Sequence, residues 1–123
     1  MSAPFRAAVE AGDHAGMVDA LAPDVVFNSP VAFQPFHGRE AVAKLFAALL
    51  QTFEDFRYTD EFEQGDAHAL VFRARVGDKE LEGVDLLRMD DEGKIRDFTV
   101  FVRPASGLMA LGQAMAPHVD GLK

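Results

Sequence analysis

The sequence predicts an α+β domain in which three N-terminal helices pack on one face of a curved antiparallel sheet. Strong helical spacing of apolar residues ends at about Phe53. From Phe56 onward, four segments alternate apolar and polar residues, and short turns separate them, as in strands joined by hairpins. A run of helices followed by a run of strands is typical of the α+β class.

Two short helices are predicted to open the chain. The first covers residues 4–11, with Ser2 as its cap. The second covers residues 14–21 and is capped by Asp13. Pro23 is expected to end it, because proline lacks the amide hydrogen that a continuing helix needs.

A short strand, a loop and a longer helix are predicted next. The strand covers residues 25–29, VVFNS, which are rich in β-branched and aromatic residues. Pro30 and Pro35 mark the loop. Gly38 precedes the longer helix, whose apolar stripe consists of Val42, Leu45, Phe46, Leu49 and Phe53.

The second half is predicted to form four strands. They cover residues 56–62, 70–76, 81–89 and 95–103, and their turns contain Gly65, Gly77 and Gly93. Pro104 ends the last strand.

Residues 105–123 are expected to extend a single domain that covers residues 1–123. Residues 106–116 carry an apolar stripe at helical spacing, and Pro117 is expected to end this helix. The stripe predicts a lid or a helix that contacts a partner; it consists of Leu108, Met109, Leu111 and Met115.

Composition excludes several kinds of protein. The chain has no cysteine, which excludes disulfides and thiolate metal sites, and its four histidines are scattered, so no metal site is expected. Its net charge of −8 and the lack of a basic stripe disfavour nucleic acid as a partner. No long apolar run predicts a membrane span. The N-terminus lacks the pattern of a signal peptide, so a cytoplasmic protein is expected.

The stretch LEGVDLLRMDDEGKI, residues 81–95, places an acid among small and apolar neighbours. In a strand, the residues that share one face are Leu81, Gly83, Asp85, Leu87 and Met89. The arginines of the neighbouring segments are predicted on the opposite face, which weakens a structural ion pair without removing it as the alternative. Asp85 is therefore the strongest candidate for a role in a pocket.

Two segments, VVFNSPVAFQPFHGREAVAKLF and GVDLLRMDDEGKI, resemble the signature segments of the ketosteroid isomerase and SnoaL-like branch of the nuclear transport factor 2-like superfamily. The resemblance extends from Phe5 to about Arg103. It implies a cystatin-like fold, in which a curved sheet wraps around three helices and forms a cone with an apolar cavity. It does not imply one activity, because this fold hosts isomerases, cyclases, hydrolases, dehydratases and non-catalytic binding modules.

The isomerases of this family use a carboxylate base together with a tyrosine and a protonated aspartate that stabilise an oxyanion. Carried over by the resemblance, the protonated aspartate corresponds to Asp85, whereas the base corresponds to Ser29 and the tyrosine to Phe5. A supporting tyrosine corresponds to Phe46. Because Ser29 has no useful basicity at neutral pH, the chain is not expected to be a ketosteroid isomerase.

The resemblance and the strand faces together predict the residues of the site. Asp85 is expected to act as a hydrogen-bond donor or acid, and His37 is the best remaining base, with a structural role beside the long helix as the alternative. His14, His68 and His118 are expected to be solvated. The ligand-binding residues are predicted to be Phe27, Ser29, Phe46, Tyr58, Phe72, Ala74, Asp85, Phe98 and Val100.

Two function classes stay open. The first is a protein that binds a small apolar ligand or substrate without a cofactor, with acid–base chemistry of the SnoaL-like kind as an option. The second is a non-catalytic binding or interaction module with a filled core. A cavity of about 300 Å³ or more favours the first. The resemblance also implies a homodimer through the outer face of the sheet, whose residues mix apolar and polar types: Val71, Val84, Leu86, Thr99 and Phe101.

Overall fold

The computed structural model describes residues 2–119, and its first half contains three helices and two strands. In chain order these are α1 (Ala3–Ala11), α2 (His14–Asp19), β1 (Leu21–Asn28), β2 (Phe36–His37) and α3 (Arg39–Thr52). Asp13 caps α2 as predicted, because its carboxylate accepts a hydrogen bond from the amide of Gly16 at 3.1 Å.

The second half consists of four long strands and one helix. These are β3 (Glu54–Gln64), β4 (Ala67–Val76), β5 (Lys79–Met89), β6 (Ile95–Arg103) and α4 (Ala105–Val119). All four predicted strands are present, and each is longer than or equal to its predicted range.

The sheet has the strand order β2-β1-β6-β5-β4-β3. It is mixed, which corrects the prediction of an antiparallel sheet: β1 runs parallel to β6, and the other neighbours are antiparallel. A hairpin fixes the relative direction of two consecutive strands, but β1 and β6 lie far apart in the sequence, so alternation alone did not reveal their pairing.

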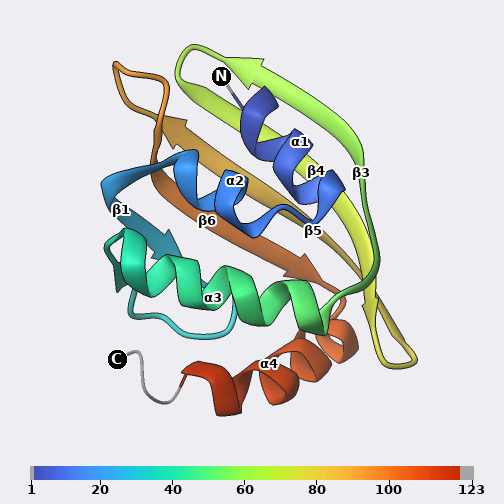
Figure 1. Cartoon of the computed structure of the whole chain (residues 1–123). Helices are drawn as coiled ribbons and strands as arrows, with labels where there is room; N and C mark the ends of the chain where they lie inside the picture. The colour runs from blue at the N-terminus through green and yellow to red at the C-terminus, as the bar shows by residue number, and fades with distance from the viewer. Residues whose placement is uncertain (1, 120–123) are drawn as a thin grey trace.

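The helices α1, α2 and α3 lie on one face of the curved sheet, and α4 lies at its lower end beside α3 (Figure 1). Aromatic rings pack between the sheet and the helices. The Phe98 ring lies 5.3 Å from that of Phe5, 5.1 Å from that of Phe27 and 5.6 Å from that of Phe46. The eleven phenylalanines of the sequence thus supply much of this core.

Two prolines do not end their elements as predicted. Pro23 lies inside β1, where the register with β6 shifts between Leu21 and Val26, and an irregular stretch of strand tolerates a residue without an amide hydrogen. Pro117 lies inside α4, which continues to Val119.

Ser2 and His68 also differ from expectation. Ser2 does not cap α1; its hydroxyl donates a hydrogen bond to Glu61 Oε2 at 3.1 Å. His68 is buried rather than solvated, because β4 starts before it and places its side chain on the inner face. Its Nδ1 lies 3.0 Å from the Ser2 hydroxyl and 2.9 Å from Glu63 Oε1.

The helix α4 packs closely against β5. A Cβ atom at Gly107 would lie 2.7 Å from Leu81 Cβ and 2.8 Å from the Glu80 carbonyl oxygen, so this close approach requires glycine. Leu111 and Met115 of the predicted stripe are buried, whereas Met109 is exposed. The side of the stripe that carries Leu111 and Met115 therefore faces the rest of the domain.

Candidate functional site

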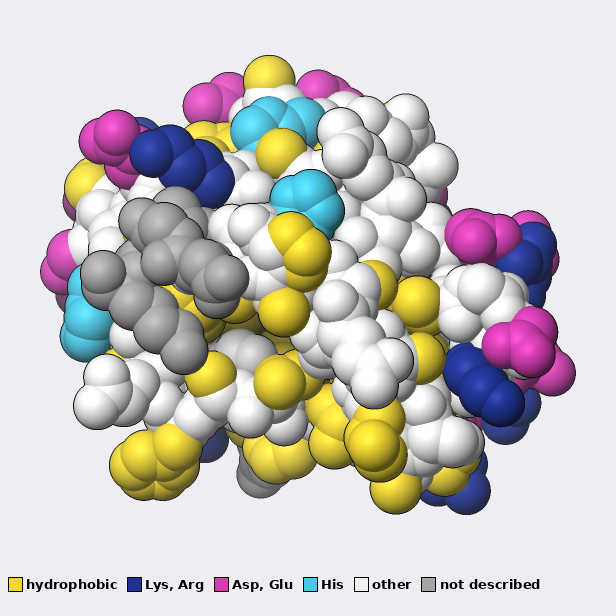
Figure 2. Space-filling model, turned by 90° about the horizontal axis from the view of Figure 1, so that it is seen from below, with side chains coloured by type: hydrophobic (Ala, Val, Ile, Leu, Met, Phe, Trp, Pro, Cys, Tyr) yellow, Lys and Arg dark blue, Asp and Glu magenta, His cyan; other side chains and the backbone are white. Residues whose placement is uncertain are grey.

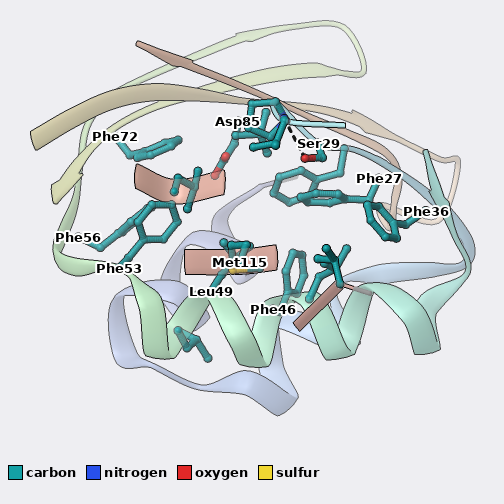
Figure 3. Close-up of a pocket in the computed structure, with 18 of the residues that line it drawn as sticks. Phe27, Ser29, Phe36, Phe46, Leu49, Phe53, Phe56, Phe72, Asp85 and Met115 are labelled. Atoms are coloured by element: carbon teal, nitrogen blue, oxygen red, sulfur yellow. Dashed lines mark hydrogen bonds between the residues drawn. The ribbon is translucent and has the colours of Figure 1, made fainter. Parts of the chain in front are cut away.

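A cavity of about 320 Å³ lies between the inner face of the sheet, α3 and α4. Figure 3 shows Phe72, Phe56 and Phe53 on one side of it, Phe27 and Phe36 on the other, and Asp85 on the sheet side. Nearly all residues around it are apolar. Among the described residues, the polar side chains that line it are those of Ser29, Tyr58 and Asp85.

Asp85 reaches the cavity from the middle of the sheet. It lies on β5 between Leu70 of β4 and Val100 of β6, and its side chain is buried. Tyr58 of β3 is also buried, and its hydroxyl donates a hydrogen bond to Asp85 Oδ2 at 3.0 Å. The two side chains form one polar pair in an apolar wall.

Burial changes the acidity of both members of this pair. Loss of water raises the pKa of Asp85 from 3.8 to about 7, and the hydrogen bond from Tyr58 opposes this rise. Burial, followed by the nearby Asp85 carboxylate, raises the pKa of Tyr58 well above its ordinary value of 10.0. Near neutral pH, Asp85 therefore exists in both the acid and the ionised form, while Tyr58 stays protonated.

The shape of the cavity beside Asp85 depends on Gly83. This residue shares the inner face of β5, and a Cβ atom there would lie 2.3 Å from the ring of Phe72. The absence of a side chain makes room for the ring of Phe72, which stacks on that of Phe56 with ring centroids 4.9 Å apart. This close approach explains the glycine of the stretch LEGVDLL.

Ser29 lies at the end of the strand β1, on the edge of the cavity. Its hydroxyl oxygen accepts hydrogen bonds from the amides of Val31 at 3.0 Å and Ala32 at 3.4 Å. The hydroxyl therefore fixes the turn that carries the next cavity residues, Pro30, Val31 and Ala32.

The sequence profile of the SnoaL-like domain matches residues 3–98 of the chain. The chain belongs to the SnoaL-like domain family. The match covers every element that forms the cavity except α4 and the end of β6.

Solved structures agree with this assignment. A steroid delta-isomerase from Pseudomonas aeruginosa is 40% identical with a TM-score of 0.90, and the match covers 97% of this chain and 88% of that one. An uncharacterised protein with a cystatin-like fold from Silicibacter pomeroyi is 35% identical with a TM-score of 0.90, over 95% and 83%. A protein of unknown function with a cystatin-like fold from Xanthomonas campestris is 28% identical with a TM-score of 0.71, over 89% and 92%. No curated protein matches the chain.

The SnoaL-like domain brings most of the predicted site residues together. Those that line the cavity are Phe27, Ser29, Phe46, Tyr58, Phe72, Asp85, Phe98 and Val100. Ala74 is buried on the same face of β4, but it is not among the residues that line the cavity.

His37 is not brought to Asp85. It lies on the short strand β2, opposite Val26, and its side chain is exposed. It is not among the described residues that line the cavity. Alternation explains this placement, because Phe36 of the same strand is buried and points inward. This placement does not support a role for His37 as a base next to Asp85.

The sequence did not assign several cavity residues that the structure places there. Phe53 and Phe56 flank the start of β3, and Leu111 and Met115 come from α4. The signal that could have identified Phe53 and Phe56 is their position, at the end of a predicted helix and the start of a predicted strand. The apolar stripe of α4 predicted burial, but nothing in it indicated which surface it covers.

Residues of α4 and of the loop after Ser29 meet at the edge of the cavity. Gly112 of α4 lies next to Val31, since a Cβ atom there would be 3.2 Å from a Val31 methyl group. On the face seen from below, hydrophobic side chains gather across the middle, and charged side chains lie toward the edges (Figure 2). Within residues 2–119, no helix is long and apolar enough to cross a membrane, and no group of three potential ligands could hold a metal ion.

Proposed function

We propose that this SnoaL-like domain binds a small, mostly apolar molecule that carries one carbonyl group. The observation that supports this most directly is the Tyr58–Asp85 pair in an otherwise apolar cavity. A volume of about 320 Å³ is within the range of small-molecule sites and argues against a filled core. The apolar lining supplies affinity, and the polar pair supplies orientation.

The acid form of Asp85 suits a carbonyl ligand. Tyr58 donates to Oδ2, so the proton of the acid form is available on the other oxygen. A carbonyl oxygen accepts such a hydrogen bond, whereas a hydrocarbon offers no acceptor and leaves the acid unpaired in the cavity. The ionised form has no proton to donate and would face the carbonyl oxygen with like polarity.

Binding of a model ketone tests this proposal. We expect the affinity for acetylnaphthalene to be constant below the Asp85 pKa of about 7. Above this pKa, the affinity should fall, and the fall should approach tenfold for each pH unit. Ethylnaphthalene has nearly the same shape without the carbonyl, and we expect it to bind more weakly at low pH. The measurement is isothermal titration calorimetry across this pH range.

Asp85→Asn provides the matched variant. Its amide keeps a donor but does not titrate, so the ketone affinity should become independent of pH. Equal affinity for the ketone and the hydrocarbon at every pH would reject the carbonyl as the recognised group.

A cofactor-free acid–base step on the bound carbonyl is the second candidate. A pKa of about 7 is well suited to proton transfer at neutral pH. Among the described residues that line the cavity, Asp85 is the one carboxyl group and there is no histidine. In the form that binds the carbonyl, Asp85 already holds its proton, so in such a step it would act as the acid and not as the base.

The likeness to a structure named as a steroid delta-isomerase raises a ketosteroid as a ligand. We nevertheless expect the protein not to isomerise a β,γ-unsaturated ketosteroid, because Ser29 holds a loop turn where the family's base is expected. Loss of one proton-transfer group costs about 100- to 10,000-fold in rate. An absorbance assay for the conjugated product checks this, and clear turnover by the pure protein would contradict it. Ser29→Asp, whose carboxylate can accept the same amide hydrogen bonds, is the variant in which activity should appear.

We also propose a homodimer through the outer face of the sheet. Val84 and Leu86 are only partly covered there, and Phe101 is 54% exposed. Apolar side chains of this kind on a sheet face indicate a contact surface. Light scattering at micromolar concentration should give about twice the chain mass of 13.4 kDa. Phe101→Asp should shift the mass to that of one chain, and a wild-type mass near 13.4 kDa would reject the dimer.

A further inference from the structure

The guanidinium group of Arg6 lies over the Tyr58 ring. The guanidinium carbon lies 5.5 Å from the ring centroid, which is within the range of a cation–π contact. The helix α1, which carries Arg6, lies across the sheet near β3 and β4 (Figure 1). Arg6 does not line the cavity; it contacts a residue that does.

Acidic residues hold Arg6 in this position. Its Nη1 donates to Glu61 Oε1 at 2.9 Å, and its Nε donates to Glu10 Oε2 at 3.4 Å. The other oxygen of Glu61 accepts a hydrogen bond from Ser2, so one carboxylate of β3 binds two residues of the N-terminal segment. The hydrogen bond from Arg6 lowers the pKa of Glu61, so the Glu61 carboxylate stays ionised and keeps its pairing with Arg6.

We infer that Arg6 is a positioning residue for the candidate site, which aims the Tyr58 hydroxyl at Asp85 and strengthens its hydrogen bond to the Asp85 carboxylate. A cation over the ring withdraws electron density and makes the hydroxyl a stronger donor. Charged groups face Tyr58 from two elements: Arg6 and Glu10 from α1, and Asp85 from β5. Tyr58 therefore lies between Arg6 and Asp85 and can transmit the effect of one to the other. The inference rests on the proposed function only in that Asp85 holds the ligand.

The expected consequence is a change in the titration of Asp85. In wild type, the hydrogen bond from Tyr58 favours the ionised form. In Arg6→Met, which keeps an apolar chain over the ring, this donor is weaker and the Asp85 midpoint should rise by about a few tenths of a pH unit. Arg6→Lys keeps the charge and should restore part of the difference.

The chain offers a direct optical readout. Tyr58 is the only tyrosine and there is no tryptophan, so the intrinsic fluorescence comes from the residue that is bonded to Asp85. A carboxylate that accepts a hydrogen bond from the phenol quenches this emission more than the neutral acid does. A pH titration of the emission therefore reports the ionisation of Asp85. Arg75→Met is the matched control, because Arg75 pairs with Glu54 and Asp55 and is not among the residues that line the cavity.

A double-mutant cycle separates a role through Tyr58 from a direct effect of charge. The Asp85 carboxyl carbon is titrated by NMR in wild type, Arg6→Met, Tyr58→Phe and the double variant. We expect the shift caused by Arg6→Met to shrink in the Tyr58→Phe background, because the hydroxyl that it acts on is absent. An equal shift in both backgrounds, or no shift in either, overturns the inference. Both readouts use the ligand-free protein, so failure of the proposed function would appear separately, as ketone binding that does not depend on pH.

Discussion

Replacing Asp85 with Asn is expected to stabilise the protein much more at pH 8 than at pH 5. The difference in the gain should be roughly 2–3 kcal/mol, since each pH unit between the unfolded and folded pKa values contributes about 1.4 kcal/mol. The physical cause is the buried position of Asp85, whose carboxylate loses water that a single hydrogen bond from Tyr58 does not replace.

The sign follows from the direction of the pKa shift. Folding raises the pKa of Asp85 from 3.8 to about 7, so between these values the native state holds a proton that the unfolded chain has released. The contribution of Asp85 to stability is complete below the lower value and is lost as pH rises through the upper one. Asparagine carries no charge at any pH and keeps an oxygen that can accept the hydrogen bond from Tyr58.

Urea denaturation of wild type and Asp85→Asn at the two pH values measures this. Asp85→Leu is the second variant; it leaves the Tyr58 hydroxyl without its partner, which costs about 1–3 kcal/mol at either pH. The pH dependence should therefore be the same in both variants, although their absolute stabilities differ. A strong loss of stability at pH 8 in both would instead identify Asp85 as an ionised partner in a structural pair.

An acid retained at an unfavourable position needs a reason outside folding, and binding supplies one. Asp85→Leu should remove the carbonyl preference, so that acetylnaphthalene and ethylnaphthalene bind alike.

The sequence predicted the parts of this site that depend on alternation within a strand. In β5, alternation placed Gly83 and Asp85 on the inner face, and the structure confirms both placements. In β4 the same rule identified Phe72. Because side chains of a strand alternate between two faces, one buried residue determines which face every other residue of that strand occupies.

The sequence could not predict contacts that depend on packing between distant elements. The parallel pairing of β1 with β6 joins segments about seventy residues apart, and no local signal indicates it. Nothing in the sequence distinguishes Arg6 from any other charged residue on a short helix. Its contact with Tyr58 is seen only when the position of α1 next to β3 is known. His68 gave a misleading signal, because a polar residue near a turn is usually solvated; here Ser2 and Glu63 bind its ring.

His37 shows the limit of inference from a resemblance. It follows a cavity residue, Phe36, and lies within a signature segment, so it is the best remaining candidate for a base that the sequence offers. The strand β2 is only two residues long, and its alternation sends the neighbour of a buried phenylalanine to the surface. His37 is therefore next to a cavity residue in the sequence, but its side chain points to the surface and not into the cavity.

Removal of α4 is expected to lower the stability of the protein strongly. In a chain that ends at Pro104, the surfaces covered by Leu111 and Met115 would be exposed to water, and the free energy of unfolding should fall by roughly 3–6 kcal/mol. Small domains have only about 5–15 kcal/mol of stability, so this chain should be close to its unfolding threshold at room temperature. Denaturant melts measure the loss, and stronger binding of an apolar dye should accompany it.

Point variants distinguish a packed lid from a helix that only contacts a partner. Leu111 is buried and lines the cavity, so Leu111→Ala should cost about 2–5 kcal/mol and weaken ketone binding. Met109 lies on the same helix and is 63% exposed, so Met109→Ala should change stability by less than about 0.5 kcal/mol. If α4 instead serves a partner surface, the order reverses: Met109→Ala alters the mass per particle in light scattering, while Leu111→Ala leaves both stability and ketone affinity unchanged.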